Sequence, residues 1–186
     1  PDYDYLSLHL AFYLASWGMY RGSSFLLQKD YKVLSPVVEE VLKPEYDCLF
    51  GVACVDLREL EVQARLTNVY DYIADYFHPI REEVAGREVT TPVSPVLITK
   101  ILMGTLGCVP AYDRFFQDGV ATYKVTTREY SLESVLRLVD FYEEHNDRLE
   151  EARRGMQCED LTYPQMKLLD MGLWQVGFER DAGDAK

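Results

Sequence analysis

The residues whose types and spacing favour chemistry lie in LITKILMGTLGCVPAYDRFF, residues 97–116. Lys100 stands in an apolar run that predicts a helix, Gly107 marks a turn, and Asp113 falls in the first turn of the next helix. A helix, a glycine turn and a second helix form a helix-hairpin-helix, a unit that can offer backbone amides to a phosphate. A structural alternative stays open. Lys100 would then be an exposed residue on a polar face, and Asp113 would be stabilised by the helix dipole.

A second candidate site is the string WGMYRGSS, residues 17–24. Its two glycines let the backbone approach a ligand closely, and Ser23 and Ser24 would present free amides at the start of a helix. With Arg21 beside them, these residues predict an anion pocket for a phosphate or a carboxylate. The alternative is a tight turn in which the serines cap a helix and Arg21 pairs with an acidic side chain.

Several common functional motifs are absent from the sequence. It has no Walker loop, no Gly-x-Gly-x-x-Gly, no His-Glu-x-x-His and no Gly-x-Ser-x-Gly. The three histidines lie in separate segments, and His9, on an apolar helix, is expected to be a hydrogen-bonded core residue. The cysteines form no Cys-x-x-Cys pair, which argues against structural zinc. We therefore expect no metal and no cofactor.

The charge balance bears on partners and location. The chain has 31 acidic against 19 basic residues and a formal net charge of -12, so phosphate backbones and anionic membranes are disfavoured as partners. The apolar window 6–20 is shorter than the roughly 20 residues that a membrane helix needs. Scattered cysteines and the lack of a visible signal peptide favour the cytoplasm, although an upstream segment before Pro1 is conceivable.

Hydrophobic periodicity predicts an all-α fold, or nearly so. We expect a single-domain multi-helix bundle over residues 1–178, with seven or eight helices around a buried central helix at 6–20. Residues 119–128 alternate and are β-branched, which favours one short β-hairpin. Residues 179–186 are expected to be a disordered tail.

The longest predicted helix follows Glu59. Its apolar residues are spaced four, three, four and four apart, which indicates one buried stripe. His78-Pro79 predicts its end or a kink. The stripe consists of Val62, Leu66, Val69, Ile73 and Phe77.

Two segments, at about residues 94–118 and 162–178, carry a resemblance. TKILMGTLGCVPAYDRFF and LTYPQMKLLDMGLWQVG resemble uncharacterised bacterial helical proteins, some of them related to the helix-hairpin-helix DNA glycosylases. The resemblance implies excision of a damaged base, with Asp113 stabilising the sugar cation, Lys100 attacking the sugar and the turn at Gly107 clamping a phosphate. The chain departs from that family where Cys108-Val109-Pro110 replaces a second glycine, because Pro110 has no amide to donate.

Two functions follow from these observations, and whether the protein is an enzyme is left open. The favoured one is a non-catalytic protein-binding or regulatory module whose tyrosine-rich acidic surface meets a protein partner. The alternative is an enzyme that processes nucleic acid or a nucleotide at a pocket containing Arg21, Lys100 and Asp113. A shared concave pocket for these three residues would favour the enzyme. An exposed Lys100, with Asp113 only capping its helix, would count against it.

Overall fold

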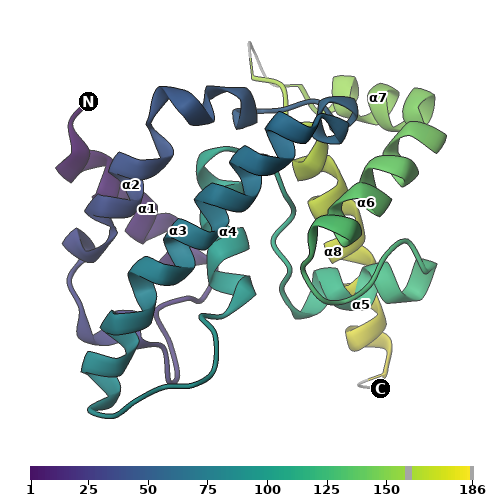
Figure 1. The fold of residues 1–186 in the computed structure, drawn as a ribbon. Coiled ribbons are helices and arrows are strands. Elements are labelled where there is room, and N and C mark those ends of the chain that lie inside the picture. The colour runs from purple at the N-terminus through teal and green to yellow at the C-terminus, as the bar shows by residue number, and fades with distance from the viewer. Residues whose placement is uncertain (158–160, 185–186) are drawn as a thin grey trace.

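The computed structural model describes residues 1–157 and 161–184, and it is built of helices joined by turns and short connections (Figure 1). This confirms the predicted all-α class, since no strand occurs in those ranges. The α-helices are α1 (Tyr3–Ser16), α2 (Ser35–Val41), α3 (Leu60–Ala85), α4 (Pro95–Thr105), α5 (Arg114–Tyr123), α6 (Leu132–Glu144), α7 (Asn146–Gly155) and α8 (Gln165–Asp184). The 3-10 helices are η1 (Phe25–Gln28), η2 (Tyr31–Leu34), η3 (Pro44–Leu49) and η4 (Cys54–Arg58).

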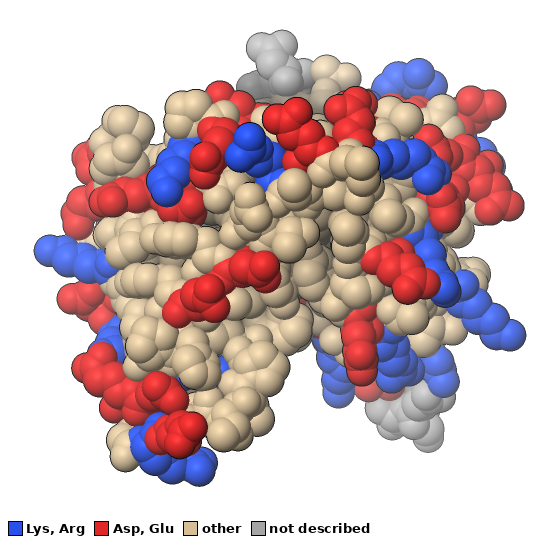
Figure 2. Space-filling view, in the orientation of Figure 1, with Lys and Arg blue, Asp and Glu red and all other residues tan. Residues whose placement is uncertain are grey.

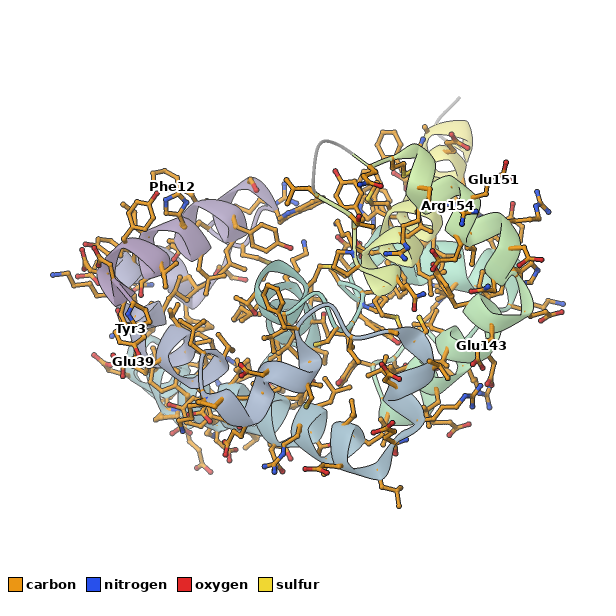
Figure 3. The ribbon with its side chains drawn as sticks, turned by 90° about the horizontal axis from the view of Figure 1, so that it is seen from above. Tyr3, Phe12, Glu39, Glu143, Glu151 and Arg154 are labelled. Carbon is orange, nitrogen blue, oxygen red and sulfur yellow. The ribbon has the colours of Figure 1, made fainter. Side chains whose placement is uncertain are left out.

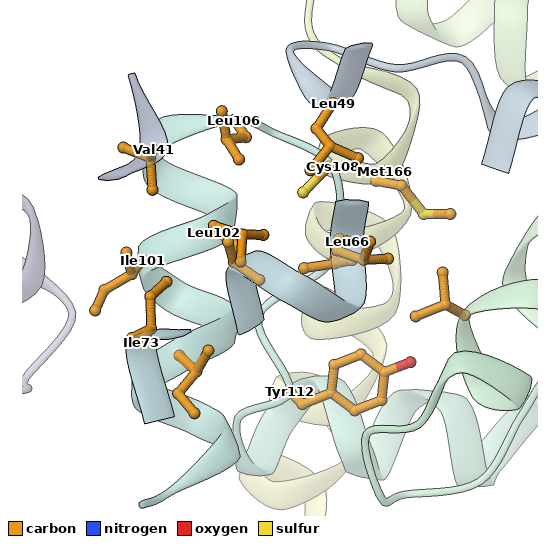
Figure 4. Packing of buried hydrophobic residues seen from close by; sticks show 14 of the residues in the cluster. Val41, Leu49, Leu66, Ile73, Ile101, Leu102, Leu106, Cys108, Tyr112 and Met166 are labelled. Carbon is orange, nitrogen blue, oxygen red and sulfur yellow. The ribbon is translucent and has the colours of Figure 1, made fainter. Parts of the chain in front are cut away.

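The helices fall into two groups along the chain. In Figure 1, α1 to α4 lie on the left and α5 to α8 on the right. The buried apolar side chains nevertheless form one cluster that draws on both groups. Figure 4 shows part of it, where Leu102 of α4 and Leu66 of α3 lie near Tyr112 and Met166. One shared core therefore fixes the position of the two groups relative to each other.

Helix α3 confirms the predicted stripe, because all five of its apolar positions are buried. Of the two outcomes predicted for His78-Pro79, an end or a kink, the end is wrong, since the helix continues to Ala85 and ends at Gly86 in a left-handed conformation. Pro79 is exposed, so the carbonyl that loses its helical hydrogen bond can be solvated. A solvent-facing proline does not have to stop a helix that is held by its buried face.

The prediction of a central helix at residues 6–20 is also wrong. Helix α1 lies at the edge of the molecule, and its apolar residues face both the core and solvent (Figure 1). Phe12 is 68% exposed, whereas Leu14 is fully buried. His9, expected in the core, is exposed and lies against the Tyr5 ring at 4.2 Å between centroids. Apolar composition alone did not reveal which side of this helix lacks a packing partner.

The predicted hairpin at 119–128 is replaced by the end of α5 and a loop. Helix α5 packs mainly on α8, and the two backbones meet at a glycine from each helix. A Cβ at Gly119 would lie 1.9 Å from the Leu173 carbonyl oxygen, and a Cβ at Gly177 would lie 1.9 Å from that of Phe115. Tertiary packing has therefore overridden the strand propensity of this segment.

The C-terminal end also differs from the prediction. Residues 179–184 belong to α8 rather than to a disordered tail, and residues 185–186 lie outside the described part. Cys48, Cys54 and Cys108 are free thiols, and Cys158 lies outside the described residues.

Candidate functional site

Lys100 is buried in the middle of α4, not exposed on a polar face. Its side chain is 6% exposed, and its ammonium Nζ donates to the backbone carbonyl of Trp17 at 3.0 Å. The same Nζ lies 3.3 Å from Oδ2 of Asp113. A charge this deeply buried needs such partners, because desolvation disfavours an unpaired ammonium.

Asp113 combines two contacts in one carboxylate. As the N-cap of α5, its Oδ1 accepts the amide of Phe116 at 3.2 Å, while Oδ2 faces Lys100. Its side chain is 15% exposed. The capping role foreseen for Asp113 is therefore present, and the second oxygen remains available to a buried cation.

A second lysine–aspartate pair, which the sequence analysis missed, lies on α8 close to the first. Lys167 Nζ is 2.8 Å from Asp170 Oδ2, and Asp170 Oδ1 accepts the amide of Ala111 at 2.9 Å. Burial raises the pKa of Asp170, against the opposing effects of Lys167 and that amide. The ammonium groups of Lys100 and Lys167 lie 5.7 and 5.2 Å from the centroid of the Trp17 ring. One signal in the sequence could have identified this pair, namely a lysine and an aspartate three residues apart in the apolar string MKLLDMGL.

Arg21, Lys100 and Asp113 line one concavity, which we call the Lys100 pocket. Its volume is about 970 Å³. Figure 2 shows the molecule notched at its lower edge, and the lining residues come from elements on both sides of that notch. The lining consists of residues 15–21, Val96, Lys100, residues 113–115 and Trp174.

The walls of the Lys100 pocket combine cations with aromatic rings. Arg21, Lys100 and Arg114 are the cationic residues of this lining, and two of them are paired: Lys100 lies 3.3 Å from Asp113, and Arg114 lies 2.9 Å from Asp181. Trp17 supplies a ring from the end of α1. On the other side, the rings of Phe115 and Trp174 meet edge to face at 5.0 Å. The pocket is thus rich in flat apolar surface and holds two of its cations in ion pairs.

Two further residues of the Lys100 pocket, Arg21 and Tyr20, are relevant to whether it can bind a ligand. Within the described residues, Arg21 is exposed and has no carboxylate at ion-pair distance, so its guanidinium can take an anion. The hydroxyl of Tyr20, also in the lining, is buried and has no hydrogen-bond partner there. Because this oxygen is closed off from solvent, a ligand in the pocket could reach it only after the Tyr20 side chain moves.

The other predicted anion-binding residues do not join this pocket. Ser23 and Ser24 line a separate hollow of about 690 Å³, together with Arg81 and Arg87. Gly107 is buried, and its amide donates to the carbonyl of Leu102 at 2.9 Å. That amide is therefore not offered to a phosphate.

The turn at Gly107 is structural in a further respect. A Cβ at Gly107 would lie 2.7 Å from the Pro164 ring, so the turn is covered by the segment that leads into α8. Because α5 packs chiefly on α8, the second helix of the predicted hairpin pairs with α8 rather than with α4. This arrangement brings Asp113 to Lys100 and buries the turn between them.

A second concavity, which we call the α1 groove, lies between α1, α2, the end of η3 and the end of α4. Its volume is about 500 Å³, and most of its lining is aliphatic or aromatic. Phe50, 73% exposed, stands in this lining. Phe12 lies beside it on the outer side of α1, as Figure 3 shows from above. The full lining is Leu6, His9, Leu10, Tyr13, Val38, Val41, Leu42, Tyr46, Asp47, Phe50, Gly104, Thr105 and Leu106.

Metal-binding and membrane-spanning features were also sought in the described part of the chain. There, no group of three or more His, Cys, Asp or Glu side chains is placed to hold a metal ion. None of the helices in those ranges is both long and apolar enough to traverse a bilayer.

Comparisons with protein-family models, with curated proteins and with solved structures give no match for this chain. The site is therefore interpreted from its own geometry.

Proposed function

We propose that the Lys100 pocket binds one nucleotide unit, either free or within a nucleic acid, and that the protein processes it there. The observation that carries this proposal is the exposed guanidinium of Arg21 in one concavity with the paired cations Lys100 and Arg114 and with aromatic rings. Cations neutralise a phosphate, and aromatic rings stack on a base at about 1–3 kcal/mol per base. The formal charge of -12 describes the average surface and does not prevent a local arrangement of this kind.

Each part of the ligand has a counterpart in the pocket. The exposed guanidinium of Arg21 suits the phosphate, because arginine binds phosphate oxygens in a bidentate way. Trp17 offers a ring whose own position is fixed by two ammonium groups.

The reaction that suits the buried pair is cleavage of the bond between base and sugar. As that bond breaks, the base leaves with the electron pair and positive charge develops at the sugar carbon, where a carboxylate such as that of Asp113 stabilises it. Water then adds to the carbon and its proton passes to the departing base. Lys100, as an ammonium bound by Trp17 and Asp113, acts here as a fixed charge that orients the carboxylate.

Binding is tested by fluorescence polarisation with labelled single- and double-stranded DNA and RNA oligonucleotides. The titrations are run at about 50 and 200 mM salt, where phosphate-driven binding weakens steeply. Arg21→Ala should weaken binding about tenfold, which is the loss of one charge-assisted contact. Arg154→Ala is the matched control, because Arg154 is an exposed cation on α7, at the far end of the molecule from α1 (Figure 3). Equal effects of the two variants, or no binding at low salt, would contradict the proposal.

Base excision is tested separately on oligonucleotides that carry damaged bases, with abasic sites revealed by alkaline cleavage. Asp113→Asn should abolish product while leaving oligonucleotide affinity within about twofold, because the lost charge acts mainly in the transition state. If the variant keeps full activity, Asp113 is not the catalytic carboxylate. If the unchanged protein binds but never excises, the binding function stands without this chemistry.

A second candidate function is the binding of a protein partner, and one specific observation favours it. Large apolar side chains are exposed along α1 and at the end of η3, among them Tyr5, Phe12 and Phe50. Contiguous exposed apolar surface is typical of interaction sites. The tyrosines of α3, in contrast, are half-buried against the core, so the exposed tyrosines of this surface are those of α1, Tyr3 and Tyr5.

A photo-crosslinking residue tests this second function. Placed at position 12 or 50 in the full chain, it should trap the same discrete partner in cells, whereas the same residue at position 154 should not. Identical products from all three positions would indicate unspecific contact and would count against a docking surface on α1.

A further inference from the structure

The α1 groove is shaped to receive a helix. Along α1, the lining residues Leu6, His9, Leu10 and Tyr13 are spaced three, one and three apart, which is the stripe that one helix offers to another. The opposite wall repeats the pattern on and just after α2, with Val38, Val41 and Leu42 as lining residues.

These two stripes belong to neighbouring helices that also contact each other. Phe50 stands at one end of the groove with nearly three quarters of its side chain exposed. Leu10, Val38 and Val41 form the buried floor of the groove, while His9 and Leu42 are exposed along it. A groove between two adjoining helices is the kind of surface into which a third amphipathic helix lays its apolar face.

The carboxylates around the groove are only partly balanced by cations. Helices α1, α2 and η3 contain no Lys or Arg within their bounds, and Lys43, between α2 and η3, pairs with the buried Glu40 at 2.6 Å. Glu39 and Asp47 are exposed, and no cation of the described residues lies at ion-pair distance from either. We call these two carboxylates the acidic rim.

We propose that the α1 groove binds a basic amphipathic helix of a protein partner, with its apolar stripe in the groove and its Lys or Arg residues against the acidic rim. The proposal rests on the second function above, a protein partner, and is independent of the Lys100 pocket. Charge complementarity selects this occupant. A second copy of this chain would bring a like-charged rim of carboxylates to the same place, and an anionic membrane would be repelled.

The experiment uses two fluorescent synthetic peptides of about 18 residues, long enough to form a helix once bound. Both carry the same leucine stripe, with lysines on the polar face of one and glutamates on that of the other. Their binding to the full chain is followed by fluorescence polarisation at about 50 and 200 mM salt. We expect the lysine peptide to bind at least about tenfold more tightly than the glutamate peptide, and the difference to shrink at the higher salt.

Two pairs of variants separate groove binding from general attraction to an acidic protein. Phe50→Ser should weaken the lysine peptide about tenfold or more, whereas Tyr123→Ser, at an aromatic residue 64% exposed on α5, should leave it unchanged. Asp47→Lys should weaken the lysine peptide and strengthen the glutamate peptide. Asp118→Lys on α5 is the charge-matched control, with effects on both peptides below about twofold.

Each contrary result identifies what fails. Binding of the lysine peptide that is equal in Phe50→Ser and Tyr123→Ser overturns the groove as the site, because attraction is then general. Tight, Phe50-dependent binding of the glutamate peptide overturns the basic occupant but leaves a helix-docking groove. No Phe50-dependent binding of either peptide, combined with a positive photo-crosslink at position 50, overturns a helical occupant while the protein-partner function stands.

Discussion

The Lys100 pocket and the α1 groove are both built on helix α1, but they differ in chemistry. The middle of α1 lines the groove with aliphatic and aromatic residues, and the groove is surrounded by carboxylates. The end of the same helix leads to Trp17, whose carbonyl and ring both meet the Lys100 ammonium. Tyr13 lies between them and belongs to the groove, yet burial, together with Asp170 and Asp113, raises the pKa of its phenol.

This contrast shows how one acidic chain can form two concavities of different chemistry. Its average charge describes neither, because the Lys100 pocket contains three cationic residues, two of them in ion pairs, whereas the helices around the groove contain none within their bounds. The two sites also depend on different packing. The pocket is lined by residues of α5 and α8 as well as by residues of α4 and the end of α1, whereas the groove is formed by elements of the N-terminal group.

The largest expected effect concerns the contact between α5 and α8, because these helices line the Lys100 pocket but not the α1 groove. Gly177→Ala places a Cβ 1.9 Å from the Phe115 carbonyl oxygen, so the helices must move apart. We expect a loss of about 3 kcal/mol in the free energy of unfolding, measured by urea titration. The peptide affinity of the α1 groove should persist under conditions where the variant remains folded.

Gly172→Ala is the control for this change on the same helix. Gly172 is exposed, and no atom lies within 4 Å of a Cβ built there. Alanine should therefore stabilise the protein by about 0.5–1 kcal/mol through helix propensity. A loss of stability similar to that of Gly177→Ala would show that the two backbones are not in close contact at Gly177.

The next effect concerns the buried pair. Asp113→Asn keeps a side chain that can cap α5 but leaves the Lys100 ammonium, 6% exposed, without its counter-charge. We expect a loss of about 2 kcal/mol in the free energy of unfolding. Lys100→Met should cost about 1 kcal/mol, because Asp113 is more exposed and retains its helix N-terminus.

Urea titrations of both single variants and the double variant measure the coupling between the two residues. If the effects of the single changes simply add, Lys100 and Asp113 do not interact, and the pair has no energetic role in shaping the pocket.

Acid should weaken the group of helices α5 to α8 through Glu150, a residue of α7. Burial of this carboxyl raises its pKa, but hydrogen bonds from Arg153, Gln165 and Tyr142 outweigh that effect and lower the pKa to about 2. Because the folded pKa is below the unfolded one, the stabilisation is complete above about pH 5 and is lost as pH falls toward 2.

Glu150→Gln should remove about 1–2 kcal/mol of this pH-dependent stability, after discounting for partial exposure. The measurement is the urea midpoint at pH 6 and at pH 3 for both proteins. Asp170, whose pKa is raised in the folded protein, makes stability change with pH in the opposite direction to Glu150. It is present in both proteins, so it does not account for a difference between them. An unchanged difference between the two midpoints at the two pH values would contradict the depressed pKa.

The smallest expected effect on stability concerns Phe12, beside the α1 groove. Phe12→Ser should change the free energy of unfolding by less than about 0.5 kcal/mol, because this side chain is 68% exposed. A loss of more than about 1 kcal/mol would mean that Phe12 is buried in solution, for example by self-association. Sedimentation at two protein concentrations would reveal that state.

Local patterns predicted a good part of the fold. The stripe of α3 and the capping of α5 by Asp113 were readable, since each depends on residues within a few positions of one another. The segment 119–128 was misassigned because its β-branched residues favour a strand, whereas its neighbour α8 accommodates a helix at Gly119. Helix α1 was placed at the centre because its composition is apolar on most sides.

The residues of the candidate site were likewise predicted only in part. Lys100 and Asp113 were chosen from residue type and spacing, and the structure brings them to 3.3 Å. Gly107 was chosen by the same reasoning, but its amide is used inside the turn. Lys167 and Asp170 were missed because the contacts that place them, Lys167 with Trp17 and Asp170 with Ala111, join residues far apart in the sequence, which no local pattern records.

The sequence by itself determined the all-α class, the main amphipathic stripes and the residue types available for chemistry, because these follow from short-range periodicity and composition. Only the tertiary structure decided that Lys100 is buried, that Arg21 joins it in one pocket and that the apolar α1 lies at the surface. Those outcomes depend on which helix faces become neighbours in space, and burial and charge pairing are properties of such neighbours rather than of single residues.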